Sequence, residues 1–86
     1  MEFEYDPAKS EANRKKHGID FEEAQALWSD PYSRGFVAKS DDEDRFAIIA
    51  TFKRKLWVAF YTPRADKVRI ISVRRARTNE RILYES

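Results

Sequence analysis

The sequence predicts an α+β domain in which helices pack on a mostly antiparallel sheet. Between residues 6 and 30, apolar side chains recur at helical spacing between capping signals. From residue 34 onward, the pattern changes to short runs of β-branched and aromatic residues joined by polar turns. The predicted order is a short N-terminal strand, two helices, a four-stranded mostly antiparallel sheet and a C-terminal helix, and we expect residues 1–86 to form a single domain.

The N-terminal elements follow from alternation and capping residues. In "MEFEYDP", apolar and acidic residues alternate, which predicts a short strand. Asp6 before Pro7 is typical of a helix start, and Gly18 after a basic turn is typical of a helix end. A second helix is expected from Asp20, which with Glu23 resembles a capping box. Its apolar stripe is Phe21, Ala24, Leu27 and Trp28, and Asp30-Pro31 ends it.

Four strands and a last helix follow. The predicted strands are "SRGFVAK", "RFAIIATF", "KLWVAFYT" and "KVRIISVR". The predicted tight turns are "KRK" and "PRAD", and Pro63 suits position i+1 of the second turn. Regular alternation in the last strand would place Val68, Ile70 and Ser72 on one face and Arg69, Ile71 and Val73 on the other. Thr78 is the expected cap of the C-terminal helix.

Composition excludes several classes of protein. The chain has no cysteine, so disulfides and thiolate metal sites are excluded. No apolar run approaches 18 residues and no leader-like segment is present, so we expect a cytoplasmic protein that neither is secreted nor contacts a membrane. No cofactor and no metal are expected. Asp41, Asp42, Glu43 and Asp44 are consecutive, which favours a solvated turn over a calcium loop, and Glu43 and Asp44 could instead pair with Arg45 or Arg64.

The net charge of +2 conceals a strong asymmetry. Residues 1–44 carry six Lys/Arg and twelve Asp/Glu, whereas residues 45–86 carry eleven Lys/Arg and three Asp/Glu. Such a split favours a polyanionic partner for the second half, although the two halves could instead neutralise each other in the fold. The basic segment "KVRIISVRRARTNER" contains no carboxylate from Lys67 to Asn79. Its guanidinium groups suit phosphate oxygens, and Ser72 is a further possible donor.

The first predicted helix carries a polar, basic face. Lys9, Asn13, Lys16 and His17 fall within about 100° of one another on a helical projection. This face could be a solvated surface or could contact phosphates. His17 could act as a general acid or base, or could complement the dipole at the helix end.

The chain resembles the BrnT family, toxins of bacterial type II toxin–antitoxin pairs. The resemblance rests on "FEYDPAKSEANRKKHGIDFEEA", "DDEDRF", "FYTPRADKVRIISVRRA" and "NERILYE", and it covers nearly the whole chain. Two departures from the family pattern, Ala50 and Val73, concern packing. The resemblance implies a RelE-like fold, and cleavage of mRNA, on or off the ribosome, that inhibits translation. It also implies neutralisation by a BrnA antitoxin, a ribbon-helix-helix protein through which the pair represses its operon at operator DNA.

The chemistry expected with this resemblance is metal-free RNA cleavage, in which the 2′-OH attacks the adjacent phosphate. The candidate catalytic residues are Arg64, Arg69 and Arg74 for phosphate, and His17 and Tyr84 for protons, with Glu80 a weaker candidate base. The candidate phosphate-binding residues are Lys9, Lys16, Arg45, Arg75 and Arg77. An extended strand would separate Arg69 from Arg74 by about 17 Å, so one phosphate could not contact both. Alternatively, the basic surface serves a non-catalytic repressor or adaptor, or mainly docks an acidic antitoxin.

Overall fold

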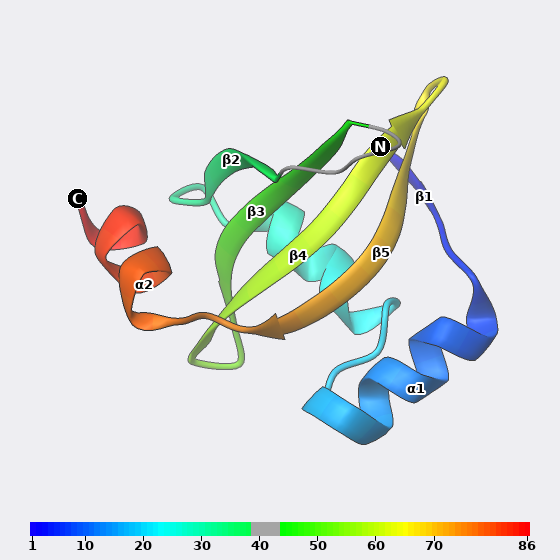
Figure 1. The fold of residues 1–86 in the computed structure, drawn as a ribbon, viewed down its shortest axis with the longest axis horizontal. Helices are drawn as coiled ribbons and strands as arrows, with labels where there is room; N and C mark the ends of the chain where they lie inside the picture. The colour runs from blue at the N-terminus through cyan, green and yellow to red at the C-terminus, as the bar shows by residue number, and fades with distance from the viewer. Residues whose placement is uncertain (39–43) are drawn as a thin grey trace.

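The computed structural model describes residues 1–38 and 44–86, so Asp41, Asp42 and Glu43 of the acidic cluster lie outside the described residues. The elements in order are β1 (Glu2–Glu4), α1 (Pro7–His17), η1 (Glu23–Ser29), β2 (Arg34–Ala38), β3 (Arg45–Phe52), β4 (Lys55–Arg64), β5 (Lys67–Arg75) and α2 (Thr78–Glu85) (Figure 1). The predicted α+β class and the predicted order of elements are confirmed.

The strands form one five-stranded sheet in the order β1-β5-β4-β3-β2. The four strands after η1 pair with their sequence neighbours in antiparallel hairpins, as predicted. The N-terminal strand joins them as a fifth strand, parallel to β5, with Phe3 opposite Val68. The connection is long enough for parallel pairing, because α1, η1 and three strands intervene between β1 and β5.

Helix α1 begins and ends where its capping residues predict. Asp6 accepts a hydrogen bond from the Ala8 backbone N–H at 2.9 Å, and Gly18 adopts a left-handed φ of 83° and donates to the Arg14 carbonyl. The predicted polar face is only partly a solvated one, because Asn13 is buried against the sheet. Its amide donates to the Ile19 carbonyl at 2.8 Å and accepts from the Val73 N–H at 3.1 Å. The helix is therefore held to β5 by hydrogen bonds.

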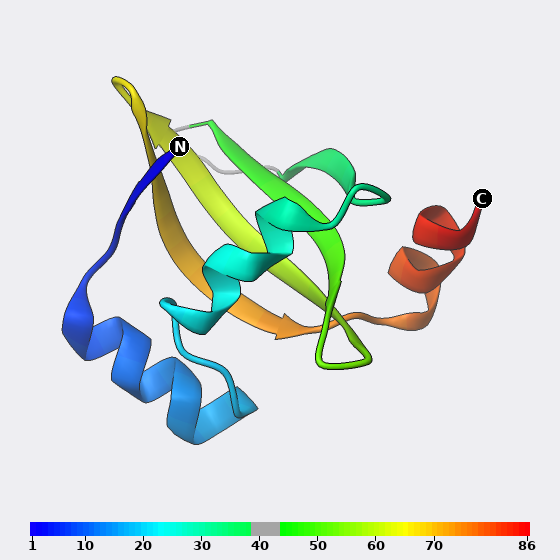
Figure 2. The ribbon, with the colours of Figure 1, turned by 180° about the vertical axis from the view of Figure 1, so that it is seen from behind.

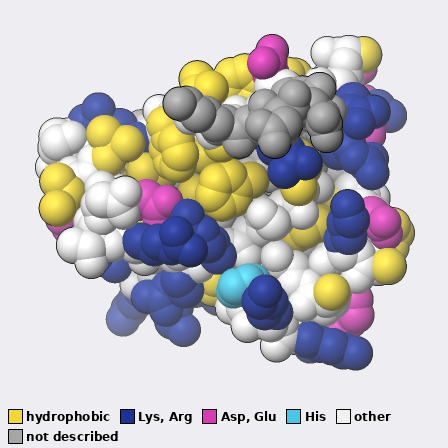
Figure 3. Space-filling model, in the orientation of Figure 1, with side chains coloured by type: hydrophobic (Ala, Val, Ile, Leu, Met, Phe, Trp, Pro, Cys, Tyr) yellow, Lys and Arg dark blue, Asp and Glu magenta, His cyan; other side chains and the backbone are white. Residues whose placement is uncertain are grey.

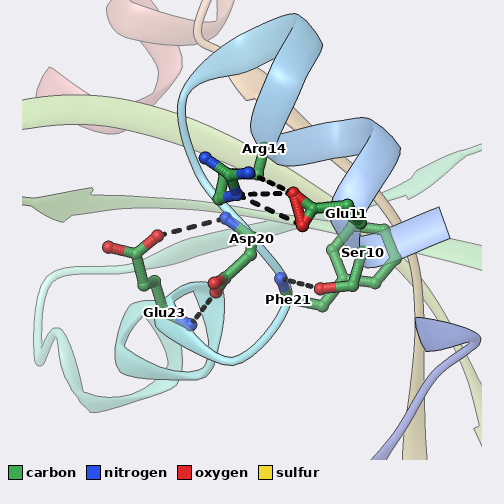
Figure 4. A network of polar contacts seen from close by, with 6 residues as sticks. All are labelled: Ser10, Glu11, Arg14, Asp20, Phe21 and Glu23. Atoms are coloured by element: carbon green, nitrogen blue, oxygen red, sulfur yellow. Dashed lines mark hydrogen bonds and ion pairs between the residues drawn. The ribbon is translucent and has the colours of Figure 1, made fainter. Parts of the chain in front are cut away.

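The second helix is shorter and tighter than predicted. Asp20 and Glu23 do form the reciprocal bonds of a capping box, with Glu23 N–H to Asp20 at 2.7 Å and Asp20 N–H to Glu23 at 3.2 Å (Figure 4). The turns that follow are 3₁₀, with three residues per turn. Phe21, Ala24 and Leu27, spaced by three, are consequently all buried. Figure 4 also shows the Ser10 hydroxyl accepting from the Phe21 N–H, which joins α1 to this segment.

One turn and one cap differ from expectation. Pro63 and Arg64 belong to β4, and the turn lies at Ala65 and Asp66, where Ala65 has a positive φ of 55°. Thr78 is the first residue of α2, not its cap. The N-cap is Arg77, whose backbone N–H donates to the Glu80 carboxylate at 2.8 Å. A glutamate three residues into the helix thus supplies the capping acceptor.

The two faces of the sheet are covered unequally. Helix α1 and η1 lie against one face, where the largest core cluster gathers around Phe21, Leu27, Trp57 and Ile70 (Figure 2). The opposite face is covered at one end by α2, which packs Tyr84 onto a smaller cluster that includes Ile49 and Val58. The remainder of this second face is called the open face below. It is the side of the molecule toward the viewer in Figure 1.

Candidate nucleic-acid interface

A β-bulge decides which side chains of β5 reach the open face. On β4, Val58, Phe60 and Thr62 alternate onto this face, and they pair with Arg74, Ser72 and Arg69. The register slips by one residue between Phe60 and Tyr61, which leaves Ile71 without a partner on β4. Arg69, Ser72 and Arg74 therefore share the open face. The expected placement of Ser72 with Ile70 is wrong, because the inserted residue reverses the alternation.

The bulge also shortens the distance between the two arginines. Their partners Thr62 and Val58 are four residues apart on β4, a span of about 13 Å rather than about 17 Å. Two long arginine side chains on one face can approach each other across such a span. The expectation that Arg69 and Arg74 must serve different phosphates rested on a regular strand, and it no longer follows.

Arg74 is held in a defined orientation by Glu80 and Phe60. Its Nη1 and Nη2 donate to the two Glu80 carboxylate oxygens at 2.8 and 2.7 Å. Its guanidinium lies 5.2 Å from the centre of the Phe60 ring. Glu80 is buried, and its hydrogen bonds from Arg74 hold the pKa of the carboxyl below its ordinary value despite that burial. Glu80 is thus a charged anchor for Arg74 and a weak base.

One edge of the Arg74 guanidinium remains available to a ligand. An arginine has five N–H donors, and Glu80 uses two of them while the Arg75 carbonyl accepts a third at 3.1 Å. The Nε–H and one Nη2–H form no hydrogen bond with the described residues, and these two donors lie along one edge. That edge matches two oxygens of a phosphate. The Arg74 side chain as a whole is 20% exposed.

Arg69 is anchored less firmly than Arg74. Its Nη1 donates to Glu4 of β1 at 2.9 Å, and both side chains are about one-third exposed. Arg45, on β3, belongs to the same face because Ala47 and Phe60 are partners and Arg45 lies two residues before Ala47. The Nε of Arg45 is buried and has no hydrogen-bond partner among residues 1–38 and 44–86. Arg64 lies at the exposed end of β4.

Other predicted site residues lie elsewhere. Arg75 pairs with Trp57 and stacks on its ring at 5.5 Å, on the face opposite to Arg74. Lys9 and Lys16 are exposed on α1, and Arg77 is exposed before α2. His17 is half-buried at the end of α1, where its side chain makes no hydrogen bond or ion pair with the described residues.

The Tyr84 hydroxyl is engaged at the far end of the open face. It donates to Asp30 at 2.7 Å, and this hydrogen bond raises the pKa of Tyr84. Burial alone would raise the pKa of Asp30. Hydrogen bonds from the Thr51 and Tyr32 N–H groups and from the Tyr84 and Thr51 hydroxyls lower it below its ordinary value. Asp30, which the sequence marked only as a helix end, therefore ties α2 to the body of the protein.

The open face combines apolar and basic character. Phe36 and Phe60 are half-buried against its apolar cluster. Figure 3 shows apolar side chains in the middle of this face with Lys and Arg side chains gathered beside them. Over the described part of the chain no pocket is present, no group of three or more His, Asp and Glu could hold a metal ion, and no helix could cross a membrane.

These features define a class of protein, a small α+β protein whose exposed sheet face carries several arginines. Residues 5–80 match the family described as "Ribonuclease toxin, BrnT, of type II toxin-antitoxin system". The match covers most of the chain, so the protein belongs to the BrnT family of ribonuclease toxins. Among curated proteins, none matches the chain. Membership confirms the resemblance seen in the sequence, and a type II toxin implies a cognate antitoxin.

Proposed function

We propose that this toxin is an endoribonuclease that cleaves mRNA by attack of the 2′-OH on the adjacent phosphate, without a metal ion, and thereby inhibits translation. The observation that carries the proposal is the bulge in β5, which places Arg69, Ser72 and Arg74 together on the open face. Such a reaction needs positive charge where the non-bridging oxygens gain negative charge, and arginine supplies it. The 2′-OH nucleophile would also restrict the reaction to RNA.

In this mechanism, Arg74 binds the scissile phosphate through its free edge, with Glu80 fixing its orientation. Arg69 contributes a second cation after releasing Glu4, which is a small step because a partly exposed ion pair contributes little. Arg45 and Arg64 bind neighbouring phosphates, and the Ser72 hydroxyl is a further donor. His17 and Tyr84 remain the candidates for taking and giving a proton. Tyr84, with its raised pKa, suits the role of acid rather than base.

Cleavage of a labelled RNA by the purified protein tests this proposal. We expect cleavage in excess EDTA, no cleavage of the matching DNA, and a product end carrying a 2′,3′-cyclic phosphate. Arg74→Ala and Arg69→Ala should each lower the cleavage rate by at least about 100-fold, the usual effect of removing one group that stabilises transition-state charge.

Arg14→Ala is the matched control, because it removes the same charge at an exposed position of α1, the helix that covers the opposite face of the sheet. It should cleave RNA at close to the wild-type rate. Cleavage of the DNA, or equal losses in Arg74→Ala and Arg14→Ala, would contradict the mechanism.

We propose further that the antitoxin is a BrnA-type ribbon-helix-helix protein, and that the pair represses its own operon through operator DNA. Family membership supports a cognate antitoxin. Co-expression with the neighbouring small gene should yield a stable complex that no longer cleaves RNA. The complex, and not the toxin alone, should retard operator DNA in a gel. Retained cleavage in the complex would refute this pairing.

A further inference from the structure

The hairpin between β3 and β4 turns through two residues that are poorly suited to their backbone conformation. Lys53 and Arg54 have φ values of 51° and 65°, both in the left-handed region. A two-residue turn of this type strongly favours Asn-Gly, because in the left-handed region the Cβ atom crowds the following carbonyl oxygen, which glycine avoids and asparagine tolerates. A lysine and an arginine at these positions therefore point to a role of their side chains outside the turn itself.

Contacts within the protein do not explain these side chains. The Lys53 Nζ lies 3.7 Å from Glu23 and 5.4 Å from the Phe52 ring centre, and the side chain is 73% exposed. An ion pair so exposed contributes little to stability. Arg54 is exposed, and its side chain makes no hydrogen bond or ion pair with the described residues. The strain of the turn is therefore not offset by packing.

The turn belongs to a larger basic surface beside the proposed site. The backbone N–H of Ala76 donates to the Leu56 carbonyl at 2.9 Å, which continues β5 alongside the start of β4. Arg75 and Arg77, on either side of Ala76, consequently lie beside the start of β4, where Lys55 is the first residue. We call the set Lys53, Arg54, Lys55, Arg75 and Arg77 the basic rim. Two carboxylates contact the rim: Glu80 accepts the Arg77 N–H and is engaged by Arg74, and Glu23, which accepts the Asp20 N–H, lies 3.7 Å from the Lys53 Nζ.

We propose that the basic rim binds the backbone of the RNA strand that flanks the cleavage site, as a second phosphate-binding surface continuous with Arg74. The inference rests on the proposed nuclease function. Proximity supports it, because Arg77 of the rim donates its backbone N–H to Glu80, the same carboxylate that holds Arg74. Five cations over a few residues attract successive phosphates of a single strand. The rim thereby contributes to binding the substrate and not to the chemical step.

A nucleic acid fits the rim better than a protein partner does. Protein interfaces bury large apolar or aromatic anchors and are depleted in lysine. The exposed large apolar side chains of the described residues are Met1, Tyr32, Val37, Ile82 and Leu83, and none belongs to the rim. The cations of the rim instead come from a hairpin tip and a strand end and are exposed, which suits contact with a flexible polyanion.

Two substitutions at Arg54 separate strain from binding. Arg54→Gly removes the charge and relieves the turn, whereas Arg54→Gln removes the charge and keeps the side chain. Only Arg54→Gly should raise the Tm, by about 4 °C or more for a domain of this size. Both should weaken binding of a non-cleavable 2′-O-methyl RNA of about 20 nucleotides. Both should also lower the slope of log affinity against log salt by about 0.7.

The double variant Lys53→Asn/Arg54→Gly should extend both effects. Its salt slope should fall by about 1.4, which corresponds to roughly 25-fold weaker binding at 0.1 M salt, while its Tm stays above that of the wild type. Its matched control is Lys15→Gln/Lys67→Gln, which removes two charges at exposed positions outside the rim. That control should bind the RNA with nearly the wild-type salt slope. For cleavage, KM should rise in the rim variant while kcat stays within about twofold.

The outcomes distinguish this inference from the proposed function. If the wild type cleaves RNA but the rim variants bind RNA with unchanged affinity and slope, the inference is wrong and the nuclease proposal stands. If the rim variants lose the antitoxin complex and keep RNA binding, the rim is a protein surface and the inference is overturned. If the wild type cleaves no RNA yet the rim variants lose RNA binding, the nuclease proposal fails and the rim remains a nucleic-acid surface.

Discussion

The ion pair between Arg74 and Glu80 should contribute more to stability than other ion pairs of the protein. A double-mutant cycle with Arg74→Met, Glu80→Gln and the double variant isolates its coupling energy. Both replacements keep most of the side-chain volume, so packing on Phe60 and the capping of α2 are disturbed as little as possible. The cycle therefore reports the charge-assisted bonds themselves.

The magnitude follows from burial and geometry. Glu80 is 8% exposed and Arg74 is 20% exposed, and the two are joined by a bidentate pair of bonds at 2.8 and 2.7 Å. Fully exposed pairs are worth about 0.2–1 kcal/mol, whereas breaking a buried pair costs about 3–5 kcal/mol. An intermediate value of about 2 kcal/mol is expected for the coupling. Glu80→Gln alone should then lower the Tm by roughly 8–16 °C.

Urea denaturation at several pH values supplies the assay. The folded-state pKa of Glu80 lies below its ordinary value of 4.5, so its stabilising effect is complete above that pH. It is lost as the pH falls through the depressed folded pKa. The difference in unfolding free energy between the wild type and Glu80→Gln should therefore be constant near neutral pH and should shrink below about pH 4.5.

The exposed pair of Glu11 and Arg14 on α1 provides the control. Its side chains are 48% and 53% exposed, so Glu11→Gln should change the free energy of unfolding far less than Glu80→Gln does. The reasoning is refuted if the Arg74–Glu80 coupling is as small as that of the control. It is also refuted if the difference between the wild type and Glu80→Gln is independent of pH from 7 to 3.

Three further predictions concern the packing of the helices. Asn13→Ala should lower the free energy of unfolding in urea by about 2–3 kcal/mol, because the Val73 N–H and the Ile19 carbonyl lose their partner. Its control is Lys9→Ala, on the exposed side of α1, which should change that free energy by less than about 0.5 kcal/mol. Equal effects of the two variants would contradict the role of Asn13. Gly18→Ala should cost about 1 kcal/mol through its φ of 83° alone, since nothing lies within 4 Å of the added Cβ; an unchanged Tm would disprove this. Tyr84→Phe should lower the free energy of unfolding by about 1 kcal/mol, because the hydrogen bond to Asp30 is lost. It should also speed amide hydrogen exchange in α2 more than in the sheet. An equal increase of exchange in α2 and in the sheet would contradict a local role of this bond.

Much of the fold could be predicted from local chemistry. Asp6-Pro7 and Gly18 mark both ends of α1 because capping depends on residues within one turn of the helix end. The reciprocal bonds of Asp20 and Glu23 are local for the same reason. The strands follow from runs of apolar residues between polar turns, and the family resemblance follows from motifs spread over the chain.

The candidate site could be predicted only in part. The concentration of arginine in the second half is a property of the sequence, and it indicates a polyanionic partner. Asn13 was recognised as polar, but its burial depends on β5, which lies sixty residues away in the sequence. Asp30 and Glu80 were likewise named for local or minor roles. Their partners Tyr84 and Arg74 are brought to them by the packing of α2.

By itself, the sequence determined the α+β class, the limits of α1, the order of the strands and the basic character of the last strand. The tertiary structure alone decided which basic side chains share one face of the sheet. The run "RIISVR" is apolar on both faces, so no periodic pattern could reveal the bulge at Ile71. One inserted residue reverses every later side chain, and it thereby moves Arg74 onto the face of Arg69 while Arg75 turns away to Trp57.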